Sequence, residues 1–390
     1  MTTQSEIGEN LFIMQTFSRR SFLCSASALA LGLSSGKLLR AAPSLQRVFV
    51  GSGGSQGILS FDWNSQSGSL TPVGNSVPMA DATWITLSAD HRFLFAATEN
   101  GSVDGKSIGR ISSFRIEQGR LIPLSTQSSA SAGSCHIALD HSGRILLAAD
   151  YGGGSAAAFL VKDGELTPAV WSRHFIGSGP MKDRQESAHA HFASFSPDNR
   201  FAYINDLGSD CIHIFHLDAK SGMLTEAGEY HAKAGSGPRT LRFHPNGHTA
   251  YSVNELDSTV DVLEWKTSDG SLKQTARLAM LASDYHGDTR ACDSVISRDG
   301  RSIYFANRDK DFLYTFQADA TSGALTPVRR SSAGGKIPRN FVLDPTERWM
   351  LVASQLSNEI CVFARDPQSG ALSEQWKSFP APTPMCITFL

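Results

Sequence analysis

Short apolar runs rich in Val, Ile, Phe and Tyr alternate with clusters of Gly, Asn, Asp and Ser from about residue 45 to the end of the chain. Apolar runs of this length, bounded by turn-forming residues, are typical of β-strands. Helical signals are scarce over the same region. The pattern therefore predicts an all-β fold.

A turn motif recurs between consecutive strands and gives the chain a repeat. The motif ends at Arg200 in S-P-D-N-R and at Arg301 in S-R-D-G-R, and its six copies are 52, 56, 48, 53 and 47 residues apart. Each copy lies between two apolar strands, and a third strand and a glycine-containing hairpin signal follow, such as S-G-A-L-T-P at 322–327. Four strands per unit at this period predict a β-propeller.

Six complete units are visible, and the two ends of the chain supply a seventh. The runs 47–50, 57–63 and 70–73 fit its last three strands, and C-I-T-F-L at 386–390 fits its innermost strand. A blade made from both chain ends closes the ring and leaves no free sheet edge. We therefore expect a seven-bladed β-propeller, closed by a blade shared between the N- and C-terminal strands, as a single domain over residues 43–390.

The first 42 residues have a different pattern. S-R-R-S-F-L at 18–23 is a twin-arginine motif, and the weakly apolar run that follows is too short for a stable membrane span. The segment resembles the bacterial signal that exports proteins already folded. We expect residues 1–42 to be this signal and to be cleaved, which would leave a periplasmic or extracellular protein without a membrane attachment.

Composition excludes several other classes. The net charge is −2, and no long basic run occurs outside the first 40 residues, so nucleic acid is not an expected partner. None of the cysteines shows C-x-x-C spacing, and H-x-H at 189–191 is a weak metal signal, so we expect no metal and no cofactor. We expect a monomer that acts on a small molecule.

Propeller topology predicts where reactive side chains gather. The first strand of a blade lines the central channel and the second runs antiparallel to it, so the start of one and the end of the other share a face. Nine positions before the end of the turn motif, the copies carry Thr83, Cys135, His191, Arg239, Cys292 and Arg339. Seven positions after it, they carry Glu99, Tyr151, Leu207, Glu255, Arg308 and Gln355.

A purely structural repeat would keep these two columns alike, whereas here they diversify into His, Arg, Glu and Tyr. Such groups around one concave mouth favour an anion site with an acid or base over a structural ion network. Arginines can bind a carboxylate or phosphate or stabilise an oxyanion. Glu255 or His191 can transfer a proton, and the sequence leaves open which of them is the base.

Neighbouring residues extend the candidate site. His136, His189 and Asp293 lie next to the first column, and His136 is either a channel residue or a satisfied core histidine. The small polar residues just before the second column, such as Asp150 and Asp206, are expected to bond the loop backbone. The longest connection between blades, 171–188, is rich in charge and is either a lid over the mouth or an exposed insertion.

At these positions the chain resembles the seven-bladed lactonase family, which includes 6-phosphogluconolactonase and the carboxymuconate-lactonizing enzymes. The matching motifs include A-H-A-H, G-P-R, N-E-L-D-S-T-V, A-N-R and G-G-K-I-P-R-N-F, and the resemblance covers nearly all of 45–390. It implies four catalytic residues: His191, Arg239, Glu255 and Arg308. The column argument adds the substrate-binding candidates His136, His189, Arg339, Tyr151, Asp293 and Glu99.

The resemblance implies a hydrolase that opens an anionic sugar-acid lactone by acid/base-assisted attack of water. Ala188 stands where the family usually has Pro, and C-D-S at 292–294 replaces its usual A-E-I, which bears on the substrate more than on the fold. Export also bears on the substrate, because phosphogluconolactone is a cytosolic metabolite. Two alternatives stay open: a lactonizing cycloisomerase acting on a muconate-like diacid, and a non-catalytic binding propeller.

Overall fold

The structure is a computed structural model that describes residues 45–390, apart from 75–76, 104–105 and 282–288. The twin-arginine motif lies outside the described residues. All regular elements in the described part are β-strands. No helix among the described residues is long and apolar enough to cross a membrane.

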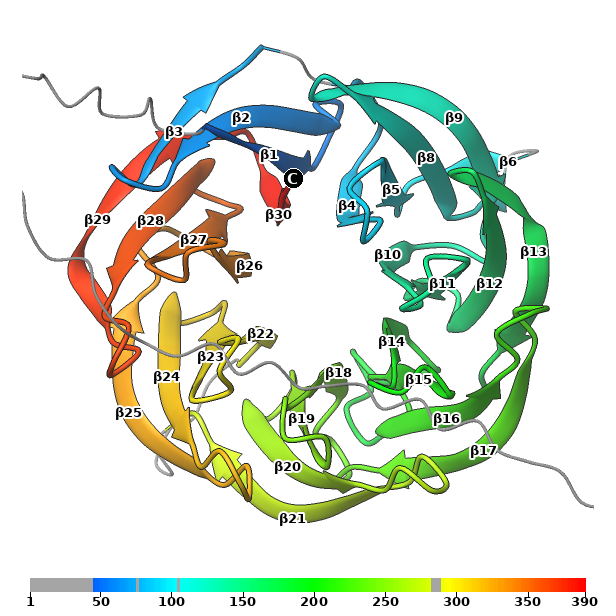
Figure 1. Cartoon of the computed structure of the whole chain (residues 1–390). Helices are drawn as coiled ribbons and strands as arrows, with labels where there is room; N and C mark the ends of the chain where they lie inside the picture. The colour runs from blue at the N-terminus through cyan, green and yellow to red at the C-terminus, as the bar shows by residue number, and fades with distance from the viewer. Residues whose placement is uncertain (1–44, 75–76, 104–105, 282–288) are drawn as a thin grey trace, which may run out of the picture. The chain divides into compact units, whose positions relative to one another are not determined.

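Seven antiparallel sheets of four strands each surround a common centre (Figure 1). The innermost strands are β4 Ala82–Leu87, β10 Ser134–Leu139, β14 Ala190–Phe195, β18 Pro238–Phe243, β22 Ala291–Ile296, β26 Pro338–Leu343 and β30 Pro384–Phe389. The second strands are β5 Phe93–Thr98, β11 Ile145–Asp150, β15 Phe201–Asp206, β19 Thr249–Asn254, β23 Ser302–Asn307, β27 Trp349–Ser354 and β1 Gln46–Ser52.

The outer half of each blade completes the sheet. The third strands are β8 Arg110–Glu117, β12 Ser155–Lys162, β16 Cys211–Leu217, β20 Thr259–Trp265, β24 Phe312–Ala318, β28 Glu359–Arg365 and β2 Ile58–Asn64. The outermost are β9 Arg120–Ser128, β13 Glu165–His174, β17 Leu224–His231, β21 Leu272–Ala279, β25 Leu325–Ser332, β29 Leu372–Pro380 and β3 Ser69–Pro72. A small hairpin, β6 Ser102–Val103 and β7 Lys106–Ser107, is inserted between β5 and β8.

The second strand of each blade is the most apolar because neighbouring blades cover both of its faces. Every residue of β5, β11, β15, β19 and β23 is buried. The outermost strands are mostly exposed, as in β13 and β25. A strand buried on both faces needs an almost continuous apolar run, whereas a half-exposed strand tolerates polar residues at every second position.

The two chain ends close the ring, as the sequence predicted. β30 pairs antiparallel with β1, with Val48 opposite Phe389 and Gly51 opposite Cys386. Figure 1 shows the red β30 on the inner side of the blue β1, as the innermost strand of the shared blade. The prediction of a seven-bladed propeller with a shared blade is therefore confirmed.

The recurring turn is held by one side chain at its start and one left-handed residue near its end. Oδ1 of Asp140 accepts hydrogen bonds of 2.8 Å from both Arg144 N and Ile145 N. Before the last residue of the motif the backbone is left-handed, with φ of 60° at Asn199 and 79° at Gly247. Asn and Gly adopt this conformation at low cost, which explains why they recur there.

A β-bulge interrupts the start of the innermost strand in every blade. In β14 the pairing steps from Ala190 opposite Asp206 to Phe192 opposite Asn205, which leaves His191 without a partner. The same step in the other blades falls at the first predicted column, and in the shared blade it falls at Met385. A bulge turns a side chain out of the normal pleat, here at one mouth of the channel.

Candidate active site

The two predicted columns meet at one pocket. A cavity of about 400 Å³ is lined by Glu99, Tyr151, Glu255 and Arg308 from the ends of second strands, by Cys135, His191 and Arg339 from the bulges, and by Arg184. Thr83 and Arg239 lie just below it, around a smaller cavity of the channel. Leu207 is fully buried and does not line the pocket.

A repeated backbone hydrogen bond brings the columns together. In the blade of β18, Glu255 N donates to Gly237 O at 2.8 Å, and in the blade of β10, Tyr151 N donates to Gly133 O at 2.8 Å. Each bond joins the residue after the second strand to the residue two positions before the bulge. Gly133 has a φ of 78°, and a Cβ there would lie 2.6 Å from the backbone of Gly152, so only glycine fits this edge of the pocket.

Glu255 is 1% exposed, and three guanidinium groups surround its carboxylate. Oε2 lies 2.8 Å from Nε of Arg239 in the same blade and 2.9 Å from Nη2 of Arg308 in the next. Oε1 lies 2.6 Å from Nη2 of Arg184. Burial raises the pKa of Glu255, but the charges of Arg308 and Arg239 outweigh burial and hold it well below its ordinary value. Glu255 is therefore a fixed anion rather than a proton acceptor near neutral pH.

His191 has the opposite character. Burial, followed by the charge of Arg239, lowers the pKa of His191 well below its ordinary value, so the ring is neutral at pH 7. Within the described part of the chain, its buried Nδ1 has no hydrogen-bond partner. The ring meets the Tyr151 ring edge to face, with the centroids 5.6 Å apart. A neutral imidazole with an unengaged nitrogen can accept a proton.

Glu99 and Arg339 form a second ion pair at the pocket, with 3.3 Å between Oε1 and Nη2. Burial raises the pKa of Glu99 despite this arginine. Four arginines and two glutamates meet in and below the pocket, so with His191 neutral the excess is two positive charges. The pocket is therefore suited to an anion.

Arg184 was not among the predicted site residues, although the connection that carries it was singled out for its length. Gln185 next to it is fully buried and donates from Nε2 to Leu207 O at 2.9 Å, which anchors the segment beside the pocket. Nη2 of Arg184 also lies 3.4 Å from the Tyr151 hydroxyl. A long charged connection leading into His189 was the only signal in the sequence.

Besides Arg239, three predicted site residues lie outside the pocket. His189 supports its wall, because its ring stacks on Tyr151 with centroids 4.5 Å apart and its Nδ1 is 2.9 Å from Tyr151 O. His136 packs against Phe192 and Trp84, and its Nδ1 accepts a hydrogen bond from Ala193 N at 3.2 Å.

Burial, followed by the charge of Arg242, lowers the pKa of His136. Its side chain is buried and hydrogen-bonded, and it also borders the channel cavities, so it combines features of the two alternatives that the sequence left open. Asp293 is also directed away from the pocket. Its carboxylate is 1% exposed, accepts from Asn340 Nδ2 at 2.9 Å and lies 3.3 Å from Nη2 of Arg242. His136 and Asp293 both follow the bulge column by one position. Regular pairing has resumed at His136, whereas Asp293 still lies in the irregular stretch between Ala291 and Ser294.

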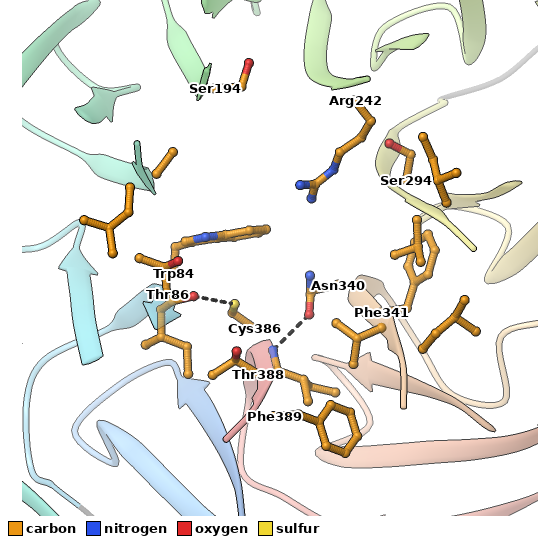
Figure 2. Close-up of a pocket in the computed structure, with 18 of the residues that line it drawn as sticks. Trp84, Thr86, Ser194, Arg242, Ser294, Asn340, Phe341, Cys386, Thr388 and Phe389 are labelled. Carbon is orange, nitrogen blue, oxygen red and sulfur yellow. Dashed lines mark hydrogen bonds between the residues drawn. The ribbon is translucent and has the colours of Figure 1, made fainter. Parts of the chain in front are cut away.

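A larger cavity of about 840 Å³ opens along the channel beyond this layer. Figure 2 shows the Trp84 ring and the Arg242 guanidinium extending into it from different blades, and Asn340 also lines it. Arg242 is paired there with Asp293, and Asn340 Oδ1 accepts from Ile387 N at 2.9 Å. Ser194 Oγ and Ser294 Oγ have no hydrogen-bond partner among the described residues, but no described residue that lines this cavity is a buried carboxylate held among arginines, as in the smaller pocket. The candidate chemistry therefore lies in the smaller pocket, where the columns converge.

Asp150, Asp206 and Asn307, three of the small polar residues before the second column, bond the loop backbone as expected, whereas Asn254 and Ser354 bond side chains. Oδ1 of Asp206 accepts from His189 N at 2.7 Å and from Gly208 N at 3.0 Å. Oδ1 of Asn307 accepts from Asp309 N at 3.1 Å. These residues set the loops at the pocket mouth and do not enter the pocket.

Comparisons with known proteins agree with this geometry. Residues 47–389 match the family described as Lactonase, 7-bladed beta-propeller. A 6-phosphogluconolactonase of Bacillus subtilis is 30% identical over 341 residues, which cover 87% of this chain and 95% of that protein. A 6-phosphogluconolactonase of Formosa agariphila is 33% identical over 326 residues, which cover 82% of this chain and 91% of that protein.

Solved structures give the same result. The Pseudomonas aeruginosa periplasmic gluconolactonase PpgL is 32% identical and superposes with a TM-score of 0.84, covering 89% of this chain and 99% of that one. The family match spans all seven blades and both predicted columns. The chain therefore belongs to the seven-bladed β-propeller lactonase family.

Proposed function

We propose that this protein hydrolyses a sugar-acid lactone in the pocket around Glu255. The observation that carries the proposal is the combination of a neutral His191 with a buried Glu255 held among three arginines. This arrangement supplies a proton acceptor beside a concentrated positive field. The names of the relatives, 6-phosphogluconolactonase and gluconolactonase, support the same class of reaction.

In the proposed reaction a water molecule attacks the lactone carbonyl while His191 takes its proton. The carbonyl oxygen becomes an oxyanion, which Arg308 or Arg339 stabilises because their guanidinium groups face the pocket. The ring C–O bond then breaks, and the protonated His191 returns the proton to the leaving ring oxygen. The products are the carboxyl group and a free hydroxyl group of the opened sugar acid.

Glu255 has a positioning role in this proposal. Both of its oxygens are engaged by arginines, and its pKa is held low by Arg308 and Arg239 against the effect of burial. It therefore fixes the guanidinium groups rather than accepting a proton. Of the two candidate bases, the geometry favours His191.

The excess of positive charge favours an anionic lactone. A phosphate or carboxylate could bind Arg184 or Arg339, which line the pocket at its wider part. We further propose that the chain is exported by its twin-arginine signal, in keeping with the periplasmic neighbour. Export favours an unphosphorylated aldonolactone or a carboxylated lactone over a cytosolic sugar phosphate.

A lactone panel tests the proposal. The purified protein is assayed with 6-phosphogluconolactone, gluconolactone and a muconolactone, and each rate is corrected for spontaneous opening. His191→Asn should abolish enzymatic opening, whereas His216→Asn, at an exposed histidine on β16, should not change it. Turnover of only the muconolactone, toward the open diacid, would move the protein to the lactonizing class. No turnover by a folded protein on any of the three would overturn the proposal as stated and favour a binding propeller.

A further inference from the structure

A second cluster of reactive side chains lies on the outer strands of the blade β14–β17, away from the pocket. Strands β16 and β17 are hydrogen-bonded neighbours at the rim of the ring (Figure 1). Their register places Cys211 opposite His231 and His213 opposite Glu229. Side chains directly opposite each other, or two positions apart on one strand, share a face. Four potential metal ligands therefore lie on one face of two adjacent strands.

The distances among these groups approach those around a tetrahedral metal. Sγ of Cys211 is 3.8 Å from Nδ1 of His213, which is 2.9 Å from Oε1 of Glu229. Nε2 of His231 is 3.4 Å from Oε2 of Glu229. Zinc bonds of about 2.3 Å to sulfur and 2.0–2.1 Å to nitrogen place two such ligands about 3.6 Å apart. Cys211, His213 and Glu229 each offer a ligand atom within 4.8 Å of the others. His213 and Glu229 must move apart to accept a metal, and the exposed His231, which contacts the other oxygen of Glu229, must turn toward the group to become the fourth ligand.

The His213 ring is already held in the orientation that a ligand needs. Phe175 stacks on it at 4.2 Å between centroids with an interplanar angle of 11°. Its Nε2 lies 3.6 Å from Oδ2 of the fully buried Asp206 and has no hydrogen-bond partner among the described residues. A ligating histidine usually presents its other ring nitrogen to a carboxylate, which fixes the tautomer. Nδ1 is thus left for the metal.

We propose that Cys211, His213, Glu229 and His231 form a zinc site that joins β16 to β17. One thiolate, two imidazoles and one carboxylate make a donor set that zinc accepts. This proposal departs from the expectation of no metal, which rested on the absence of C-x-x-C spacing, because the ligands here alternate along one strand and are completed across the ladder. It is independent of the proposed lactone chemistry.

Binding would rearrange protons in a defined way. The Cys211 thiol releases its proton to solvent, and His213 binds the metal through Nδ1 while its Nε2 faces Asp206. Burial raises the pKa of the Cys211 thiol, so zinc must compete with a proton and its affinity rises with pH. Glu229 and His231 are exposed, with side-chain exposures of 45% and 71%, and provide the route of entry.

Cobalt(II) is the probe for the test, because it reports a thiolate ligand by a charge-transfer band. The protein is stripped with a chelator, titrated with one equivalent of Co²⁺ and then with Zn²⁺. The wild type should show the band, and zinc should remove it. Cys211→Ser should lack the band. Cys361→Ser should keep it, because Cys361 is equally buried on β28 but lies opposite Ser378.

Two surface variants keep the test valid if Cys211→Ser fails to fold. Glu229→Gln and His231→Asn alter exposed side chains, and each should weaken zinc at least tenfold with the circular dichroism spectrum unchanged. The proposal is overturned if the wild type gives no thiolate–cobalt band. It is also overturned if the band is lost in Cys361→Ser but kept in Cys211→Ser, or if both surface variants bind zinc as tightly as the wild type.

Discussion

His191 and Glu255 line the same pocket but differ in what holds them. Three arginines engage the Glu255 carboxylate, whereas Nδ1 of His191 has no hydrogen-bond partner among the described residues. Removing the carboxylate would leave buried guanidinium groups uncompensated, at a cost of about 3–5 kcal/mol. Removing the imidazole breaks no side-chain hydrogen bond to Nδ1. The two substitutions should therefore affect stability and activity differently.

We expect His191→Asn to lower kcat/KM by about 10²–10⁴, the range for loss of a general base, with little change in the free energy of unfolding. Glu255→Gln should lower both kcat/KM and the free energy of unfolding, because it removes a charge that positions the arginines. Lactone turnover and urea unfolding, measured on the same preparations, check this. An active His191→Asn would exclude the histidine as base, and a fully stable Glu255→Gln would show that its ion pairs do not stabilise the fold.

The pH dependence of activity follows from the lowered pKa of His191. Burial is the largest cause, and the charges of Arg239 and Arg339 add to it. A base works when it is deprotonated, so a lowered pKa keeps it active below pH 6.5, where a free histidine would be charged. We expect the acid limb of kcat/KM to lie below pH 6.5 and to move to higher pH in Arg339→Gln.

Arg200→Gln is the matched control, because it removes the same charge from an exposed arginine on a turn. It should leave the acid limb of kcat/KM at the same pH. A limb at or above pH 6.5 in the wild type would contradict the assignment.

The same lowered pKa predicts that the unfolded chain binds a proton that the folded chain does not as the pH falls below 6.5. The His191 contribution to stability should therefore become less favourable on acidification.

The site residues could be predicted from the sequence at those repeat positions where the residue type differs from copy to copy. His191, Arg239, Glu255 and Arg308 were found because aligned positions of a repeat share a place in the fold. His136 and Asp293 were included because they lie one residue away. Only strand pairing shows where each bulge begins and ends and therefore which neighbouring side chain faces the pocket, and pairing cannot be read from one sequence.

At the scale of elements, the connection between β13 and β14 has the clearest experimental consequence. It places Nη2 of Arg184 2.6 Å from Glu255 at the mouth of the pocket, with 33% of the side chain exposed. A hydrogen bond to a charged group contributes about 1.5–3 kcal/mol, or roughly 10–100-fold in affinity. We expect Arg184→Gln to raise KM for an anionic lactone within this range, with a smaller effect on kcat.

Arg173→Gln is the matched control, because Arg173 on β13 pairs with Glu226 at the exposed rim of the ring. It should leave KM unchanged. Steady-state kinetics with an anionic and a neutral lactone separate the charge effect from a general disturbance, since only the anionic substrate should lose affinity. Equal losses on both substrates would favour a lid that closes over the pocket regardless of charge. The course of this segment could not be predicted, because no repeat constrains it.

The pairing of β16 with β17 could likewise not be predicted from the sequence. The sequence predicts that Cys211 and His213 share a face, because they alternate on one strand. It cannot place Glu229 and His231 opposite them, because the register depends on a bulge between Ile214 and Phe215. Local patterns thus predicted strands, turns and ring closure, whereas contacts across strands needed the structure.

At the scale of the whole molecule, the cysteines bear on the proposed export of the protein. The five cysteines of the described residues are all buried and form no disulfide. Burial raises the pKa of each thiol, as for Cys292 to about 11, which keeps the thiols unreactive. A chain that crossed a membrane unfolded would expose all five to an oxidising compartment. Folding before export avoids this.

We therefore expect export to require the twin-arginine motif at 18–23 and a folded propeller. Lys-Lys in place of Arg19 and Arg20 should leave active protein inside the cell, as measured by lactonase activity in fractionated cells. Replacing residues 1–42 with a signal for the unfolded-chain export route should deliver protein whose thiols are partly oxidised and whose specific activity is lower. Thiol titration under denaturing conditions checks this. Full export of the Lys-Lys variant, or fully reduced and active protein from the unfolded route, would contradict the link between buried thiols and folded export.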